Sequence, residues 1–153
     1  MKSIIQENQK WINDTWDKIE NKLSAVAVKS REKLPYTTIE GTHDDKKEKN
    51  IAWWTNGFWG GMMWLMYEAT GNEEFRKTAE RSEELLDGAL FQYKKLHHDV
   101  GFMWGLTSKA NYILTDDKSA RTKALIAANI LAGRANIKGR YIYIMSYLIT
   151  LIV

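Results

Sequence analysis

The sequence predicts an all-α fold, and two observations support this prediction. Apolar residues recur at steps of three and four through most of the 153-residue chain, which is the spacing of one face of an α-helix. No segment before residue 140 alternates apolar and polar side chains as a half-buried strand does. Because the junctions between helical segments are short, we expect antiparallel helical hairpins, and repeated hairpins predict a toroid or solenoid.

The first predicted helix covers about residues 4 to 31 and is followed by a loop. Pro35, the single proline, is expected to end this helix. Residues 36 to 50 are polar and carry charges of both signs, which is typical of a solvated loop and not of a nucleic-acid patch. The apolar residues that repeat along the helix are Trp11, Ile12, Trp16, Ile19, Leu23 and Val26.

Two further helices are predicted on either side of a Gly-Asn junction. One covers about residues 57 to 70, and Gly71 is expected to end it in the left-handed conformation. Asn72 is expected to cap the next helix, whose first turn holds Glu73 and Glu74, where the helix dipole favours anions. The predicted inner face of that helix consists of Phe75, Ala79, Leu85, Leu86 and Ala89.

The last two predicted helices meet at a pair of aspartates. The fourth covers about residues 102 to 114, and Asp116 or Asp117 is expected to cap the fifth, which ends near Gly133. The predicted inner face of the fifth helix consists of Ala120, Ala124, Ala127, Ala128 and Leu131.

The net charge of +3 is unevenly distributed along the chain. Residues 1 to 117 carry 16 basic and 19 acidic side chains, whereas residues 118 to 153 carry six basic side chains and no acidic one. The basic isoelectric point of about 9.0 therefore comes from the C-terminal residues.

The composition excludes several kinds of site. The chain has no cysteine, so it has no disulfide, thiolate metal site or cysteine nucleophile. Two of its three histidines are adjacent and it lacks phosphate-binding glycine motifs, so we expect no metal and no cofactor. The N-terminus is polar and no apolar run reaches the roughly 18 to 20 residues of a spanning helix. We therefore expect a cytoplasmic protein with neither a membrane nor a nucleic acid as partner.

Residues 53 to 64 hold four tryptophans and three glycines, which is unusual for the start of a helix. Proteins bind sugars by stacking an aromatic ring on the apolar face of the pyranose while amide groups bond its hydroxyls. Trp54 and Asn56 fit those roles. The alternative is that the rings belong to the core and that the glycines permit close helix packing; Trp59 and Trp64 are expected in the core in either case.

A second segment, residues 96 to 104, places His97, His98 and Asp99 before a glycine and an apolar helix. Asp99 could simply cap that helix, which is a common role of aspartate. The alternative is a catalytic acid or base set beside a histidine and among aromatic rings.

Together, the two segments resemble glycoside hydrolase family 88, the unsaturated glucuronyl hydrolases. The resemblance covers about residues 5 to 142. The motifs that carry it are WTNGFW at residues 54 to 59 with Gly61, YEATG at 67 to 71, HHDVGF at 97 to 102 and TSKA at 107 to 110.

This resemblance implies a fold, a reaction and a set of site residues. The family fold is an α/α barrel of six helical hairpins, and its members release unsaturated glucuronic acid from oligosaccharides left by polysaccharide lyases, such as glycosaminoglycan fragments. An aspartate protonates the enol-ether double bond of the sugar, water adds at the neighbouring carbon, and the resulting hemiketal breaks down. By position, Asp99 matches the first of two active-site aspartates and Trp54 the sugar-stacking tryptophan; His98 and Asn56 are implied to contact the substrate.

The chain departs from the family pattern near its C-terminus. The second family aspartate follows a Gly-x-x-Ile segment, which residues 139 to 142 match, but the next residues differ and no acidic residue follows Asp117. We therefore interpret residues 1 to 142 as the N-terminal portion of the barrel and residues 143 to 153 as an aberrant apolar tail, consistent with truncation or a frameshift; a genuine apolar strand or helix is the alternative. Such a chain is expected to have impaired activity and to self-associate through its open barrel, and the competing hypothesis is a non-catalytic helical module that binds carbohydrate or protein.

Overall fold

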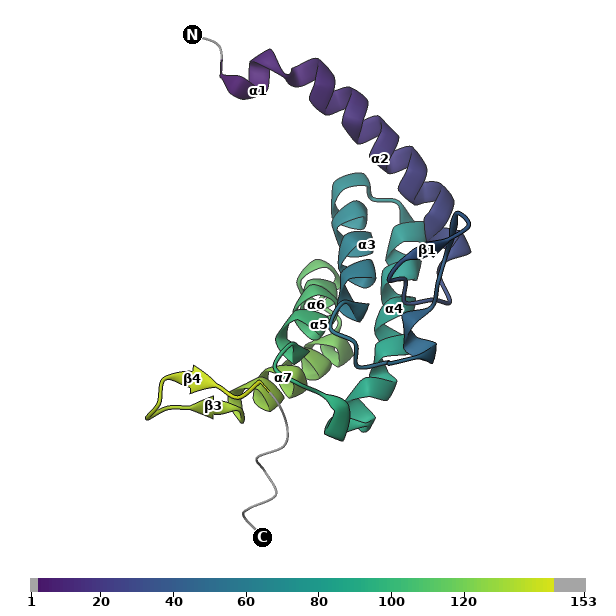
Figure 1. The fold of residues 1–153 in the computed structure, drawn as a ribbon. Helices are drawn as coiled ribbons and strands as arrows, with labels where there is room; N and C mark the ends of the chain where they lie inside the picture. The colour runs from purple at the N-terminus through teal and green to yellow at the C-terminus, as the bar shows by residue number, and fades with distance from the viewer. Residues whose placement is uncertain (1–2, 145–153) are drawn as a thin grey trace.

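The computed structural model describes residues 3 to 144, which form a mostly helical structure (Figure 1). Helices α3 (Asn56–Thr70) and α4 (Glu73–Phe91) lie side by side at its centre. Helices α5 (Val100–Leu106), α6 (Ser108–Thr115) and α7 (Lys118–Ala132) pack on one side of this pair, and α2 (Gln9–Lys29) extends away from it. The all-α prediction is therefore confirmed for the bulk of the described residues.

The first predicted helix is interrupted near its start. A four-residue helix, α1 (Ile4–Glu7), is capped by Ser3 and ends at Asn8, whose side-chain amide donates to the carbonyl of Ile4 at 2.9 Å. This local bond competes with the helical backbone pattern, and α2 starts afresh at Gln9. The helix ends at Lys29, so Pro35 does not set its end as predicted.

Only the C-terminal end of α2 is anchored to the rest of the chain. Arg31 pairs with Glu74 of α4 and donates to the hydroxyl of Thr78 at 3.2 Å, and Arg81 of α4 pairs with Glu32 at 2.8 Å. Ala27 is the one buried residue of α2 in the described structure. The predicted apolar face further toward the N-terminus is exposed at Trp11, Ile12, Trp16 and Ile19.

Two short hairpins are additions to the predicted all-α fold. Strands β1 (Thr38–Ile39) and β2 (Thr42–His43) pair antiparallel across a turn in which Glu40 and Gly41 both have positive φ. Strands β3 (Ala135–Asn136) and β4 (Tyr141–Ile142) form a second hairpin beyond α7. Each strand has two residues, which is too short to produce the alternation that identifies a strand in a sequence.

Short 3₁₀ segments complete the connections. The first, η1 (Lys46–Glu48), is capped by Asp45, and η2 (Tyr93–Lys95) follows α4. Within the predicted polar loop, Asp44 accepts backbone N–H bonds from Tyr36 and Thr37 at 2.8 Å each. Side-chain-to-backbone bonds therefore help to order this loop.

The predicted helix boundaries at Gly71 and Asn72 are confirmed. Gly71 has φ of 68° and ends α3, and the side-chain oxygen of Asn72 accepts the backbone N–H of Glu74 at 2.9 Å. Asp117 caps α7 by accepting from the backbone N–H groups of Ser119 and Ala120, while Asp116, with φ of 60°, ends α6.

The fourth predicted helix is two helices. It begins at Val100 and is broken at Thr107, whose φ and ψ of −105° and −86° are not helical. The hydroxyl of Thr107 donates to the carbonyl of Met103 at 2.7 Å, a bond of the kind that bends helices.

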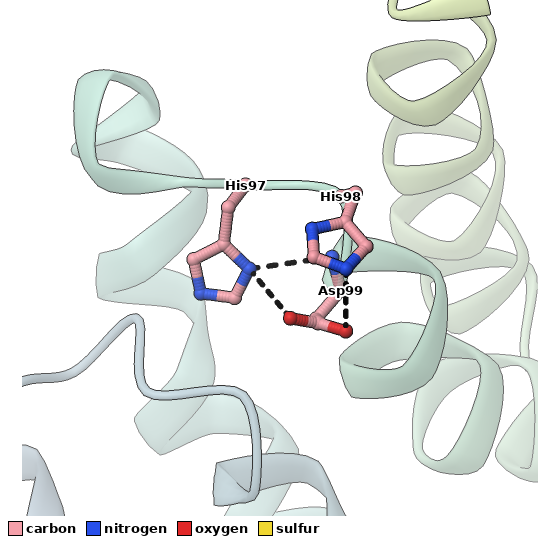
Figure 2. A group of neighbouring side chains, drawn as sticks. All are labelled: His97, His98 and Asp99. Carbon is pink, nitrogen blue, oxygen red and sulfur yellow. Dashed lines mark hydrogen bonds and ion pairs between the residues drawn. The ribbon is translucent and has the colours of Figure 1, made fainter. Parts of the chain in front are cut away.

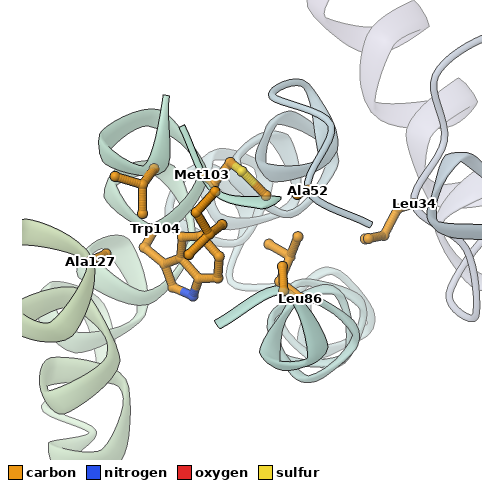
Figure 3. Close-up of a cluster of buried hydrophobic side chains, with 9 residues drawn as sticks. Leu34, Ala52, Leu86, Met103, Trp104 and Ala127 are labelled. Carbon is orange, nitrogen blue, oxygen red and sulfur yellow. The ribbon is translucent and has the colours of Figure 1, made fainter. Parts of the chain in front are cut away.

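The core consists of two groups of buried side chains. One joins α4, α5 and α7 and includes Leu34 and Ala52, which hold the loops before and after η1 in place (Figure 3). The other lies between α3, α4 and α2. It contains Ala27, Trp59, Met63, Trp64, Met66, Phe75 and Ala79. The predicted core positions of Trp59 and Trp64 are confirmed.

None of the helices in residues 3 to 144 is both long enough and apolar enough to cross a bilayer; the cytoplasmic location stays a prediction. The predicted tail, residues 143 to 153, lies outside the described residues except for Tyr143 and Ile144. The backbone N–H of Tyr143 donates to the carbonyl of Arg134 at 2.9 Å and so continues the β3–β4 hairpin.

Candidate functional site

The tryptophan-rich segment leads into α3 at Asn56, whose side chain is hydrogen-bonded to the backbone of the preceding loop. This side chain is fully buried, and its amide nitrogen donates to the carbonyls of Asn50 and Ile51 at 3.1 and 2.9 Å. Its amide oxygen is buried and has no hydrogen-bond partner among the described residues. Asn56 therefore fixes the backbone before α3, and its predicted contact with substrate stays a prediction.

Trp54 lies on the surface, unlike the tryptophans further along α3. Its ring is 40% exposed and packs edge-on against Phe58 with centroids 5.6 Å apart. The neighbouring Trp53 is half-buried, with the ammonium of Lys46 4.3 Å from its ring centroid. The segment thus lies partly in the core and partly on the surface, because Trp59 and Trp64 are buried while Trp54 is exposed; the sugar-stacking role of Trp54 stays a prediction.

The second segment folds its three polar side chains into one group, shown in Figure 2. One carboxylate oxygen of Asp99 lies 3.0 Å from Nδ1 of His97, and the other lies 3.4 Å from Nε2 of His98. The Asp99 side chain is 17% exposed. Both oxygens of a mostly buried carboxyl group are therefore held by imidazole rings.

Asp99 occupies the capping position of α5, yet its side chain makes no capping hydrogen bond. The backbone carbonyl of Asp99 accepts the first helical bonds instead, from the N–H groups of Phe102 and Met103. A simple capping role is therefore not what the structure shows. The carboxyl group is turned toward the two histidines and away from the end of the helix.

The two predicted segments are brought together at the N-terminal ends of α3 and α5. His97 lies with Nε2 2.9 Å from the carbonyl oxygen of Ala52, across 45 residues of sequence. A Cβ atom on Gly57 would lie only 2.6 Å from Cα of Met103, so the two backbones approach closely at this point. Trp54 and Asp99 therefore belong to neighbouring surface segments.

His97 contacts both segments of the candidate site, and the sequence did not predict this role. Its adjacency to His98 was visible, but its bond to Ala52 depends on how α3 and α5 pack. His43 was also missed: its ring lies 2.8 Å from the hydroxyl of Ser30 and packs edge-on against Trp59. No periodicity or motif in the sequence indicates either contact.

His97, His98 and Asp99 are the one group of His, Asp or Glu side chains in residues 3 to 144 whose potential ligand atoms all lie within 4.8 Å of one another. Ordinary hydrogen bonds account for their spacing, since the backbone N–H of Asp99 also donates to Nδ1 of His97 at 3.3 Å. Three consecutive residues also supply no fourth ligand of a closed zinc site. The contacts do not require a metal, and its predicted absence stays a prediction.

A cavity of about 350 Å³ lies beside the tryptophan segment. Phe58, which packs against Trp54, forms part of its wall. Its remaining lining residues are Pro35, Tyr36, Thr37, Thr38, His43, Thr55, Trp59 and Met62. Asp99 and Trp54 are outside this lining, so this cavity is not formed by the candidate site residues.

A buried acid away from the site was also missed. Glu83 of α4 is 3% exposed, accepts from the amide of Asn111 at 3.1 Å and lies 3.9 Å from Nζ of Lys123. Burial raises the pKa of this carboxyl group above its ordinary value. Its spacing from Ala79 and Leu86 places it on the apolar face of α4, and this helical spacing is a signal that could have identified it.

No protein-family profile matches the chain, but individual proteins do. An unsaturated glucuronyl hydrolase of Bacillus sp. (strain GL1) is 45% identical over 82 residues, which make up 53% of this chain and 22% of that protein. An unsaturated chondroitin disaccharide hydrolase of Streptococcus pneumoniae is 37% identical over 90 residues, or 58% of this chain and 23% of that protein. The match thus spans less than a quarter of the length of these relatives.

Solved structures of unsaturated glucuronyl hydrolases are also similar to this chain. The unsaturated glucuronyl hydrolase of Bacillus sp. GL1 matches with a TM-score of 0.63 and 34% identity, covering 82% of this chain and 32% of that one. A structure of a variant UGL with dGlcA-Glc-Rha-Glc matches with a TM-score of 0.59 and 33% identity, covering 72% of this chain and 30% of that one. The described helices therefore correspond to part of an α/α barrel.

Proposed function

We propose, from the homology of this chain to part of the unsaturated glucuronyl hydrolases of glycoside hydrolase family 88, that it acts on the unsaturated glucuronic acid of lyase-generated oligosaccharides such as glycosaminoglycan fragments. The observation that carries the proposal is the carboxyl group of Asp99. It is mostly buried, is held by two imidazoles and is turned away from the helix it could cap. Such a group is suited to proton transfer.

The proposed reaction is hydration of the enol-ether double bond. Asp99 in its protonated form gives its proton to one alkene carbon, and water adds to the neighbouring carbon, which bears the ring oxygen. The carboxylate thus formed can accept the proton that the water loses, so the step consumes only water. The product is a hemiketal, which opens and releases the rest of the oligosaccharide.

Trp54 and His98 supply the proposed substrate contacts. The open face of the Trp54 ring can stack on the apolar face of a pyranose. The ring of His98 is 39% exposed, and its Nε2, which faces Asp99, is the nitrogen that would have to donate to a sugar oxygen, because its Nδ1 is buried. For Asn56 the proposed contact would use its amide oxygen. Because this side chain is buried, the backbone that it binds at Asn50 and Ile51 would have to move to expose it.

We expect the activity to be low. The family resemblance implies a second aspartate, and no acidic residue follows Asp117 in this chain. In an assay of these 153 residues alone, Asp99 therefore acts without an acidic partner from a later segment.

The test is consumption of an unsaturated chondroitin disaccharide, followed by loss of its enol-ether ultraviolet absorbance. Asp99→Asn should reduce turnover by about 10²–10⁴-fold, since it removes the proposed acid. Asp116→Asn is the matched control, because Asp116 is exposed between α6 and α7 and pairs only with Lys118 in the described structure. Equal turnover in Asp99→Asn and the wild-type chain would rule out the assignment.

The second candidate function is a non-catalytic module that binds carbohydrate or protein. The exposed side chain of Trp54 favours it. In this case the disaccharide should bind saturably without being consumed, and Trp54→Ala should abolish binding. Trp11→Ala, at an exposed tryptophan of α2, should leave binding unchanged; equal loss in both variants would rule out a specific sugar contact at Trp54.

A further inference from the structure

His97 is the described imidazole that contacts both halves of the candidate site. Its Nε2 lies 2.9 Å from the carbonyl oxygen of Ala52, just before the tryptophan pair, and its Nδ1 lies 3.0 Å from the carboxyl group of Asp99 (Figure 2). The side chain is 25% exposed. Both ring nitrogens are therefore engaged by groups from segments 45 residues apart.

Each ring nitrogen of His97 has a matched hydrogen-bonding role. A carbonyl oxygen only accepts hydrogen bonds, so Nε2 of His97 is the nitrogen that carries a hydrogen and donates it to Ala52. Nδ1 accepts the backbone N–H of Asp99 at 3.3 Å and lies 3.0 Å from one oxygen of the Asp99 carboxyl group. His97 therefore contacts both the backbone and the carboxyl group of Asp99.

We propose that His97 is a positioning residue that holds Asp99 through its contacts with the backbone N–H and the carboxyl group of that residue and ties it, through Ala52, to the segment that carries Trp54. This inference rests on the proposed function for its consequence in catalysis. It assigns His97 a role distinct from that of His98, which flanks the other carboxyl oxygen. His97 acts through Asp99 and is not itself placed against the substrate.

The capping position of α5 explains why such a residue is needed. A carboxylate at this position normally swings onto the free N–H groups of the first helical turn. In that orientation the carboxyl group of Asp99 would turn away from the His97 and His98 rings. The contact with His97 keeps the carboxyl group off the helix end, and the bond from His97 to Ala52 keeps the ring itself from turning.

The first test is nitrogen NMR of the histidine rings in the sugar-free protein. We expect Nε2 of His97 to carry a proton, and we expect Asp99→Asn to shift the Nδ1 resonance while Nε2 stays protonated. Asp116→Asn should move neither resonance. A bare Nε2, or an Nδ1 resonance that is identical in the wild-type and Asp99→Asn proteins, would overturn the inference without bearing on whether the chain binds sugar.

The second test separates the two contacts of His97 by side-chain length. The amide of His97→Asn can reach the place of Nδ1 and donate to Asp99, whereas that of His97→Gln can reach the place of Nε2 and donate to Ala52. If His97 positions Asp99, His97→Gln should lower turnover of the unsaturated disaccharide while leaving its binding unchanged, and His97→Asn should restore part of the turnover. Wild-type turnover in His97→Gln would overturn the inference and leave the proposed function standing.

The two proposals fail separately. If the wild-type chain neither binds nor consumes the disaccharide but shows the expected Nδ1 shift in Asp99→Asn, the proposed function is wrong and the His97–Asp99 pairing is supported. Since His97→Gln can fail to fold, the comparison of wild-type and Asp99→Asn spectra decides the pairing by itself.

Discussion

Glu83 shows how burial changes the chemistry of a single residue. This carboxyl group is 3% exposed on the face of α4 that packs toward α6 and α7, where Asn111 donates to it and Lys123 lies nearby. Burial raises its pKa above 4.5, although the bond from Asn111 acts in the opposite direction. The folded protein therefore holds a proton on Glu83 at pH values where the unfolded chain has released it.

This difference predicts a pH dependence of stability. Because the folded pKa is the higher one, the free energy of unfolding should fall as pH rises from 4.5 through the folded value. Glu83→Gln removes the titrating group, so its stability relative to the wild type should increase across that window. Denaturant unfolding at a series of pH values measures this difference. Glu84→Gln, at an exposed position, is the control, and a parallel pH profile for Glu83→Gln and the wild type would contradict the prediction.

Residue type alone left the roles of Trp54 and Asp99 open, since a core ring and a helix cap were ordinary alternatives. The motifs that resemble glycoside hydrolase family 88 singled out these two residues, and their roles stay predictions. The burial of Asn56 and the bond from His97 to Ala52 depend on contacts between segments distant in sequence. Neither contact can be predicted from the spacing of residues along the sequence.

Helices were predicted well because their signals are local. The end of α3 at Gly71 and the caps at Asn72 and Asp117 follow from backbone and side-chain chemistry within a few residues. The break at Thr107 was missed because the apolar spacing continues across it while the backbone does not. The hairpins were missed because two-residue strands carry no periodicity.

Packing between α3 and α5 gives the clearest prediction at the level of elements. A Cβ on Gly57 would meet backbone atoms of Met103 at 2.6 and 2.7 Å, and backbone cannot move aside as a flexible side chain can. Gly57→Ala should destabilise the protein by about 1–3 kcal/mol. In Gly105→Ala the added Cβ would meet nothing within 4 Å, and this helical change should stabilise by roughly 0.5–1 kcal/mol. Chemical denaturation compares the two, and equal stability would show that α3 and α5 are not closely packed.

At the scale of the whole molecule, the surface is unusually apolar around α2 and α3. Trp16 and Ile19 of α2 and Leu65 of α3 are exposed and line a groove of about 550 Å³ between these helices. A second apolar groove, lined by Leu65 and Ile113 among others, runs between α3 and α6. Apolar surface of this extent favours association.

We therefore expect the purified chain to self-associate in a concentration-dependent manner. Leu65→Lys places a charge between the two grooves and should shift the protein toward the monomer in sedimentation velocity experiments. Ile137→Lys changes an exposed apolar residue of the β3–β4 hairpin and should leave association as it is. A wild-type chain that stays monomeric at all concentrations would show that these apolar grooves do not drive self-association.

The central claim is that Asp99 protonates an alkene carbon of an unsaturated glucuronic acid. The most direct measurement is to incubate the chain with an unsaturated chondroitin disaccharide in heavy water and to examine the released uronate by NMR. The account predicts deuterium on the carbon next to the hydrated one, loss of the double bond, and little or no such product from Asp99→Asn. Release of a uronate that keeps its double bond and carries no deuterium, or undiminished product from Asp99→Asn, would contradict it.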